Sequence, residues 1–300
     1  MNKILLLGIV VVFAVISCEH NEEETHPNDN PEPGTGVTDP EIFLQTGQGY
    51  SYRFNDFDFY DSSTCIFYFR TIHEEFADFD LGFFVFLDSC DTIYVGSFWP
   101  MYMNSMPFGP FISAPLSMYG NYALRIENWW HEGQPDPRNS PEMIMVLKEH
   151  NLLHSGLAVH INAVKINGDS LDFTFSVINA DSTDLLILDP DKTGPALFHY
   201  FTNGLYLYDE DHQAVFTGNI KHQAPDPWNS WQYLWLSELR SGDSVTYTIR
   251  YPIETPLESG TYQAVFEFPG LAYQVGKGQL YQGNARIWLG DVQCIKKITF

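Results

Sequence analysis

The stretch LDFTFSV at residues 171–177 decides the fold class of this chain, because apolar and polar side chains alternate along it. The stretch VTYTIRY at residues 245–251 repeats the alternation. A period of two places one set of side chains on a buried face and the other set in water, as in a strand of a β-sandwich. Both stretches therefore predict half-buried strands.

Turn-forming residues separate such strands along the second half of the chain. They are Asn167-Gly168-Asp169, Asp209-Glu210-Asp211 and Arg240-Ser241-Gly242-Asp243. Strands that recur at intervals of roughly ten residues between turns are typical of sandwiches. We therefore expect an all-β chain with two β-sandwich domains, one over residues 45–150 and the other over residues 151–300.

The first domain is expected to contain strands that are apolar on both faces, such as IFYF at residues 66–69. From Trp99 to Tyr122 the chain is rich in Met, Pro, Gly and Ser, which predicts a long irregular loop. One helix is predicted from Ser140 to about Leu153, because Ser140 suits the N-cap and Pro141 the first turn. We expect this helix to bridge the two domains.

Tyr262 opens a predicted strand after Gly260-Thr261 and resembles the tyrosine corner of immunoglobulin-like domains, in which the hydroxyl bonds the backbone a few residues back. Residues 155–300 resemble the intracellular proteinase inhibitor (BsuPI) family. The matching features are Asn179, the hairpin LYLYD to AVF at 205–216, LRSGD at 239–243 and GTY at 260–262, whereas the insertion 217–235 departs from the compact family pattern. The resemblance implies an immunoglobulin-like C-terminal sandwich, but a shared fold does not imply inhibition of proteases.

The N-terminal sequence has the pattern of an export signal. Lys3 precedes the apolar run from Ile4 to Ile16, which is too short to span a bilayer. The run closes on VISC at residues 15–18 and resembles a bacterial lipoprotein signal with its lipobox. The resemblance implies removal of residues 1–17 and acyl chains, such as palmitate, on Cys18. The alternative is a plain secretory signal in which Cys18 is incidental.

Residues 18–44 are predicted to be a flexible acidic linker. They contain EHNEEE at 19–24, followed by Asn, Asp, Pro, Gly and Thr up to Pro40, with too little apolar surface to fold. Acidic residues behind a lipidated cysteine resemble the export signal of Bacteroidota-type surface lipoproteins. This resemblance implies a lipid-anchored protein of the outer membrane that faces the cell exterior. A lipoprotein that faces the periplasm remains the alternative.

The charge of the chain limits its partners. There are 15 Lys and Arg against 38 Asp and Glu, which gives a formal net charge of -23. Such a surface repels phosphate backbones, so nucleic acid is not an expected partner. It favours divalent cations, basic partners, or neutral ligands such as sugars.

The cysteines and the paired polar residues are weaker signals. Outside the inner membrane thiols tend to oxidise, and Cys65 and Cys90 are the favoured disulfide pair, although three unpaired buried thiols remain the alternative. His150 and His154 have the spacing of zinc ligands, but Asn151 stands where a zinc hydrolase needs Glu, so no metal site is predicted. The carboxylates of residues 189–194 and 209–211 would suit calcium, and ordinary Asx turns also explain them. We therefore expect no cofactor other than possible calcium.

Two tryptophan clusters are the candidate ligand site. Trp129 and Trp130 precede a Pro-Asp-Pro loop, and a second Pro-Asp-Pro is followed by Trp228, Trp231 and Trp235. The proposed ligand-binding residues are Trp129, Trp130, Trp228 and Trp231. Adjacent residues on a strand point to opposite faces, so Trp129 and Trp130 cannot easily both be core residues. Exposed aromatic rings are typical of sugar-binding surfaces and protein interfaces. The alternative is that the rings close the ends of the sandwiches or the seam between them.

No catalytic motif is present: the chain has neither a Gly-x-Ser-x-Gly elbow nor a phosphate-binding loop. The leading hypothesis is therefore a non-catalytic accessory lipoprotein that binds a glycan or a protein partner. A surface glycoside hydrolase, or another hydrolase with unrecognised carboxylates, is the first alternative. A protease inhibitor is the second.

Overall fold

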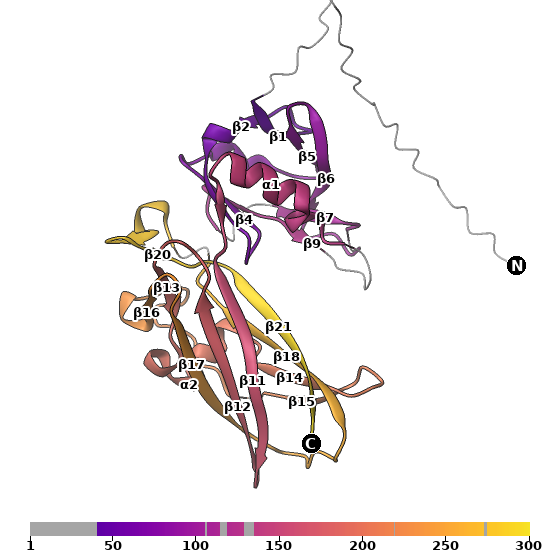
Figure 1. Cartoon of the computed structure of the whole chain (residues 1–300), viewed down its shortest axis with the longest axis vertical. Coiled ribbons are helices and arrows are strands. Elements are labelled where there is room, and N and C mark those ends of the chain that lie inside the picture. The colour runs from indigo at the N-terminus through magenta and orange to yellow at the C-terminus, as the bar shows by residue number, and fades with distance from the viewer. Residues whose placement is uncertain (1–40, 106, 115–118, 129–134, 219, 273–274) are drawn as a thin grey trace, which may run out of the picture.

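The computed structural model describes residues 41–300 apart from residues 106, 115–118, 129–134, 219 and 273–274 (Figure 1). Cys18, the acidic linker up to residue 40, Trp129 and Trp130 therefore lie outside the described residues. Within the described ranges, no helix is long and apolar enough to cross a membrane. The chain is all-β, as the alternating sequence predicts, with two α-helices among the described residues.

The first half of the chain forms two sheets. One has the order β2-β1-β5-β6-β7-β9 and the other the order β10-β3-β4-β8. The strands of the first sheet are β1 (Ile42–Thr46), β2 (Ser51–Arg53), β5 (Gly82–Asp88), β6 (Asp91–Pro100), β7 (Pro110–Ala114) and β9 (Glu127–Asn128). The strands of the second are β3 (Phe57–Asp61), β4 (Ile66–Phe69), β8 (Ala123–Arg125) and β10 (Leu153–His154). β7 lies within the stretch predicted to be an irregular loop, and it pairs in parallel with β6.

The two sheets face each other across an aromatic core. Phe67 on β4 stacks on Phe86 of β5 with ring centroids 4.9 Å apart, and it makes an edge contact with Phe43 of β1 at 5.7 Å. The other face of β4 carries Ile66 and Tyr68, which pack with the core of the second half of the chain. Because successive strand residues point to opposite faces, β4 is buried on both sides. This explains why its sequence has no polar residue.

The predicted helix is present, but it does not bridge the two halves. α1 (Pro141–Glu149) begins after Ser140, whose Oγ accepts a hydrogen bond from the Met143 amide at 3.2 Å, so the predicted N-cap is confirmed. Its buried residues Met143, Val146 and Leu147 pack into the aromatic core of the first half. The helix ends at Glu149, and β10 then pairs with β3. The predicted limits of the two domains stay a prediction.

The second half is built on two facing sheets with a smaller third sheet at one end. The large sheets have the orders β11-β12-β17 and β15-β14-β18-β21, and the third has the order β16-β13-β20-β19. Figure 1 shows β11, β12 and β17 running beside one another in the lower part of the molecule, with β18 and β21 in the second layer. The bounds are β11 (Leu157–Asn167), β12 (Ser170–Asn179), β13 (Leu185–Leu188), β14 (Leu205–Tyr208), β15 (Ala214–Thr217), β16 (Leu236–Leu239), β17 (Ser244–Pro252), β18 (Thr261–Pro269), β19 (Tyr281–Gln282), β20 (Ala285–Ile287) and β21 (Asp291–Thr299).

The alternation in the sequence becomes the core of this sandwich. Phe173 and Phe175 on β12 are buried, and their ring centroids lie 4.8 Å and 4.7 Å from that of Phe266 on β18 in the opposite sheet. The tyrosine corner is also confirmed, because Tyr262 Oη donates to the Glu258 carbonyl oxygen at 2.7 Å. Short 3-10 helices complete the described structure at Phe54–Asp56, Glu74–Asp78, Pro137–Asn139, Tyr233–Trp235 and Lys277–Gln279.

A buried cation joins the two halves. Arg286 on β20 is 1% exposed, and its Nη2 donates to Asp61 Oδ2 of the first half at 2.9 Å and to Asp181 Oδ2 of the second half at 3.3 Å. Its guanidinium lies over the ring of Phe59, 4.6 Å from the centroid. Paired charges and an aromatic face offset part of the cost of removing the cation from water, while its buried Nε and Nη1 have no hydrogen-bond partner among the described residues. Arg286 therefore ties the two halves into one body.

The predicted disulfide between Cys65 and Cys90 is not formed, and neither residue is bonded to Cys294. Cys65 lies directly before β4 and is buried, with its Sγ 3.7 Å from Asn139 Nδ2 and 3.8 Å from the Ser62 carbonyl oxygen. Cys90 lies in the turn between β5 and β6 of the other sheet. Cys65 and Cys90 border successive apolar segments of the sequence, but these segments belong to different sheets.

Candidate functional site

The site begins at a helix that the sequence did not predict. α2 (Pro190–Phe201) starts after Asp189, whose Oδ1 accepts a hydrogen bond from the Asp191 amide at 2.9 Å. This contact has the geometry expected of an Asx turn, but here it caps a helix. Gly194, at φ 72° and ψ 161°, interrupts the helix, and Pro195 begins the next turn. The sequence did not predict this helix because Gly194 and Pro195 both disfavour a helix interior.

The insertion at residues 217–235, which we call the insertion segment, lies across this interrupted helix. The Gln223 amide donates to the Ala196 carbonyl oxygen at 2.9 Å. Tyr200 Oη donates to Asn229 Oδ1 at 3.1 Å. At the end of the segment, the Trp235 carbonyl oxygen accepts a hydrogen bond from the Asp189 amide at 2.9 Å. The segment is therefore held against α2 at three points along its length.

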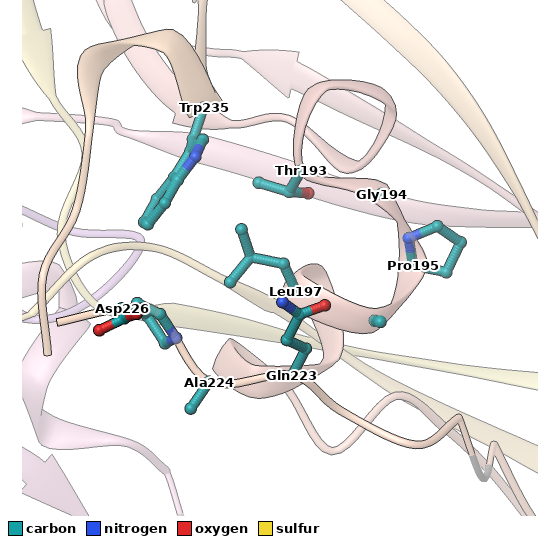
Figure 2. A pocket seen from close by; sticks show the side chains of 10 residues that line it. Thr193, Gly194, Pro195, Leu197, Gln223, Ala224, Asp226 and Trp235 are labelled. Atoms are coloured by element: carbon teal, nitrogen blue, oxygen red, sulfur yellow. The ribbon is translucent and has the colours of Figure 1, made fainter. Parts of the chain in front are cut away.

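Between α2 and the insertion segment lies an open cavity of about 310 Å³. Figure 2 shows Trp235 and Leu197 reaching into it from two sides, with Gln223 beside Leu197. The lining residues are Thr193, Gly194, Pro195, Ala196, Leu197, Gln223, Ala224, Pro225, Asp226 and Trp235. Ligand pockets usually span about 300–1,000 Å³, so this one is suited to one small unit, such as a single sugar ring.

The lining of the cavity is apolar with a few polar groups. Trp235 is buried and forms one wall, whereas Gln223 and Asp226 add an amide and a carboxylate. Among the lining residues that the structure describes, Asp226 is the ionisable one. The nearby Lys192 directs its Nζ to the Leu236 carbonyl oxygen at 2.6 Å instead. This arrangement disfavours an anionic ligand and suits a neutral molecule that has both apolar faces and hydroxyl groups.

The tryptophans proposed from the sequence have different surroundings. Trp228 is 70% exposed and lies two residues beyond Asp226 of the cavity. Trp231 is half-buried against the core of the second half and makes an edge contact with Tyr233, with ring centroids 4.7 Å apart. Trp235 forms the cavity wall; it belongs to the second tryptophan cluster of the sequence but was not among the four proposed ligand-binding residues. The signal that could have identified it is its position at the end of the insertion segment.

The other candidate groups have structural partners. The ring of His150 stacks on Phe54 at 3.5 Å, whereas His154 Nδ1 lies 2.8 Å from Asp181 Oδ1, so the two imidazoles have separate partners. Asp209 Oδ1 accepts hydrogen bonds from the amides of Asp211 and Gln213 and forms a turn. Within the described ranges, no group of three or more His, Cys, Asp or Glu residues is placed to hold a metal ion.

No protein-family model and no curated protein matches this chain. Among solved structures, the chain is similar to the yjhA protein from Bacillus subtilis, with 17% sequence identity, a TM-score of 0.20, and coverage of 38% of this chain and 74% of that chain. It is also similar to an X-ray structure of a Northeast Structural Genomics Consortium target, with 10% identity, a TM-score of 0.19, and coverage of 46% and 81%. Neither likeness carries an argument about function.

Proposed function

We propose that this chain is a lipid-anchored accessory protein of the outer membrane that binds a neutral glycan without cleaving it. The cavity between α2 and the insertion segment holds one sugar ring, and the exposed Trp228 beside it supports the next part of the glycan. Acylation of Cys18 and the acidic linker hold this site away from the bilayer. The observation that carries the proposal is the cavity with an indole wall and no cationic lining residue among those described.

The chemistry of the lining supports a sugar. A pyranose has a face of C–H groups, which packs on the Trp235 indole and the Leu197 side chain by burial of apolar area. Its hydroxyl groups donate to the Asp226 carboxylate and exchange hydrogen bonds with the Gln223 amide. An anionic sugar would meet the Asp226 charge and the net charge of -23, and it would bind more weakly.

A glycan array tests the proposal with the full chain in detergent. Trp228→Ala and Asp226→Ala change residues that the fold does not bury, so both variants are expected to fold normally. Each is expected to weaken binding to the best neutral glycan by about tenfold, the usual consequence of removing a central contact. Ile295→Ala is the matched control, because Ile295 is 55% exposed on the distant strand β21.

Three outcomes would contradict the proposal. Glycan binding that both variants retain would place the site elsewhere. Equal binding of acidic and neutral glycans would contradict the inference that the Asp226 charge selects neutral sugars. Release of shorter products from a bound glycan would replace the binding protein with a hydrolase. Slowing of a protease by the same preparation would favour the alternative function, a protease inhibitor.

A further inference from the structure

A second surface of this protein exposes large apolar side chains on the first half of the chain. Phe108 is 92% exposed and Tyr102 is 73% exposed. Among the described residues between 81 and 108, the other exposed large apolar side chains are Leu81, Phe83, Val95, Met101 and Met103. We call these seven residues the 81–108 surface. Soluble proteins seldom leave so many large apolar groups together in water, and such patches usually mark an interaction site.

Strand register places Phe83 and Val95 on one face of the first sheet, and Phe108 lies three residues before Phe111, which pairs with Ser97 of β6. Phe83 pairs with Ser97 and Val85 with Val95, so Phe83 and Val95 lie on the same outer face. Gly82 pairs with Phe98 in the last pair between β5 and β6, so Leu81 lies just beyond the end of that pairing. Leu81, Phe83 and Val95 therefore form the part of the 81–108 surface that lies on the β5–β6 hairpin.

The loop after β6 is tied to this end of the sheet. Tyr102 Oη donates to Asp80 Oδ1 at 3.1 Å, next to Leu81. The Met101 amide donates to the Ala114 carbonyl oxygen of β7 at 2.9 Å. Trp99 Nε1 donates to the Ser105 carbonyl oxygen at 3.1 Å. The exposed Met and Tyr side chains therefore lie on an anchored loop beside Leu81 and Phe83.

The outer face of the second half shows what an ordinary solvent face looks like in this chain. On β12 the outward positions are Asp172, Thr174 and Ser176, which pair with polar side chains of β17. On β5 the corresponding outward position is Phe83, which is 55% exposed. The apolar residues of the 81–108 surface therefore differ from the polar residues that this chain places on an exposed sheet face elsewhere.

The charge of the region defines the chemistry of a partner for this surface. Residues 71–124 contain six acidic residues and no Lys or Arg. A second copy of this chain, with its net charge of -23, is repelled from such a surface. The acidic linker is repelled as well, because residues 19–40 contain seven acidic residues and no Lys or Arg. An anionic bilayer is disfavoured for the same reason.

We propose that the 81–108 surface binds a basic amphipathic segment of a partner protein. The apolar side of the segment covers Phe83, Tyr102 and Phe108, and its Lys and Arg side chains face the surrounding carboxylates, including Asp78 and Asp80. The flexible side chains of Met101 and Met103 adjust to the shape of the segment. The surface is independent of the cavity at α2, so the chain would hold a glycan and a protein partner at the same time.

Peptide binding to the full chain in detergent tests this proposal. The probe is a synthetic helical peptide of Lys and Leu with one apolar face. Its matched controls are a scrambled peptide of the same composition and a peptide with Glu in place of Lys. We expect the amphipathic Lys–Leu peptide to bind at least tenfold more tightly than either control. The double variant Tyr102→Ser/Phe108→Ser should lose this advantage, and Ile295→Ser should keep it.

The outcomes separate charge, membrane and surface effects. If the scrambled peptide binds as tightly as the amphipathic one, attraction is general and the proposal fails. Full binding by the double variant, with unchanged thermal unfolding, would overturn the assignment of the surface. Tighter binding to vesicles of neutral phosphatidylcholine than to the peptide, lost in the double variant, would replace the protein partner with a lipid surface.

Discussion

Replacing Arg286 by Met tests the buried ion cluster that joins the two halves of the chain. The side chains of Arg286, Asp61 and Asp181 are almost completely buried, with exposed fractions of 1%, 0% and 0%. Methionine keeps much of the apolar stem but removes the cation. Two buried carboxylates would then remain without their shared positive charge.

The expected loss follows from the geometry of the cluster. Removing one partner of a buried ion pair costs about 3–5 kcal/mol, because the remaining charge stays out of water. The contacts of the guanidinium with the rings of Phe59 and Tyr68, at 4.6 Å and 5.6 Å from their centroids, are lost as well. Asp181 keeps its hydrogen bonds from His154 and from the Gly156 amide, which limits the loss. We expect Arg286→Met to lower the free energy of unfolding by about 3–5 kcal/mol.

The assay is urea unfolding of the full chain, followed by tryptophan fluorescence and far-UV circular dichroism. Trp288 reports on the seam directly, because its Nε1 donates to Ser63 Oγ of the first half at 3.1 Å. The matched control is Arg250→Met, which removes an equivalent bond to Asp172 at the surface. This control should leave the unfolding midpoint nearly unchanged, since solvent screens exposed ion pairs.

A second substitution makes the reasoning refutable. Adding Asp61→Asn to Arg286→Met removes one of the two uncompensated charges, so the double variant should be more stable than Arg286→Met alone. In the wild-type background, Asp61→Asn should be destabilising because it breaks the pair. The reasoning is refuted if Arg286→Met unfolds at the same urea concentration as Arg250→Met, or if Asp61→Asn is equally destabilising in both backgrounds.

Four further predictions concern single groups. Burial alone would raise the pKa of Asp181, but the His154 ring and the Arg286 guanidinium hold this pKa well below its usual value. The stability that this shift contributes is present above a pH of about 4 and is lost as the pH falls further. Asp181→Asn should therefore make the free energy of unfolding, measured with urea, depend less on pH on the acid side. Ser140→Ala removes the N-cap of α1 and should cost about 1 kcal/mol in the same assay, whereas an unchanged midpoint would show that the cap contributes nothing. Tyr262→Phe removes the tyrosine-corner bond and should cost about 0.5–1.5 kcal/mol with the fold retained by circular dichroism. Cys18→Ser should release the protein from the membrane fraction of cells and abolish any fatty-acid mass on the intact protein; continued sedimentation with membranes would contradict anchoring by this residue.

Much of the fold could be predicted from local patterns. Alternation over residues 171–177 and 245–251 identified β12 and β17, because one face of each strand is buried and the other is wet. Ser140 and Tyr262 were also readable, since a helix cap and a tyrosine corner depend on residues only a few positions apart. These features are local, so a single sequence contains the information that they need.

The errors have a common physical origin. α2 was missed because Gly194 and Pro195 are poor helix residues, yet packing against the insertion segment holds the interrupted helix in place. The predicted disulfide failed because strand order, not sequence spacing, places Cys65 in one sheet and Cys90 beside the other. α1 was expected to bridge the two halves, but its position near the predicted domain boundary does not determine which core it packs against.

The candidate site shows the same division. The Pro-Asp-Pro loop and Trp228 were recognisable in the sequence because turn residues beside an aromatic residue favour exposure. The cavity was not, because it joins Leu197 of α2 to Trp235, and the role of Trp235 depends on the path of the insertion segment.

The sequence by itself determined that this is an all-β chain with half-buried strands, a capped helix, and a strongly acidic composition. Only the tertiary structure decided that the second face of β4 packs against the other half of the chain, and that Arg286 meets Asp61 from 225 positions away in the sequence. The physical reason is that alternation and turn chemistry act over a few residues, whereas burial of a charge depends on which distant groups the folded chain brings around it.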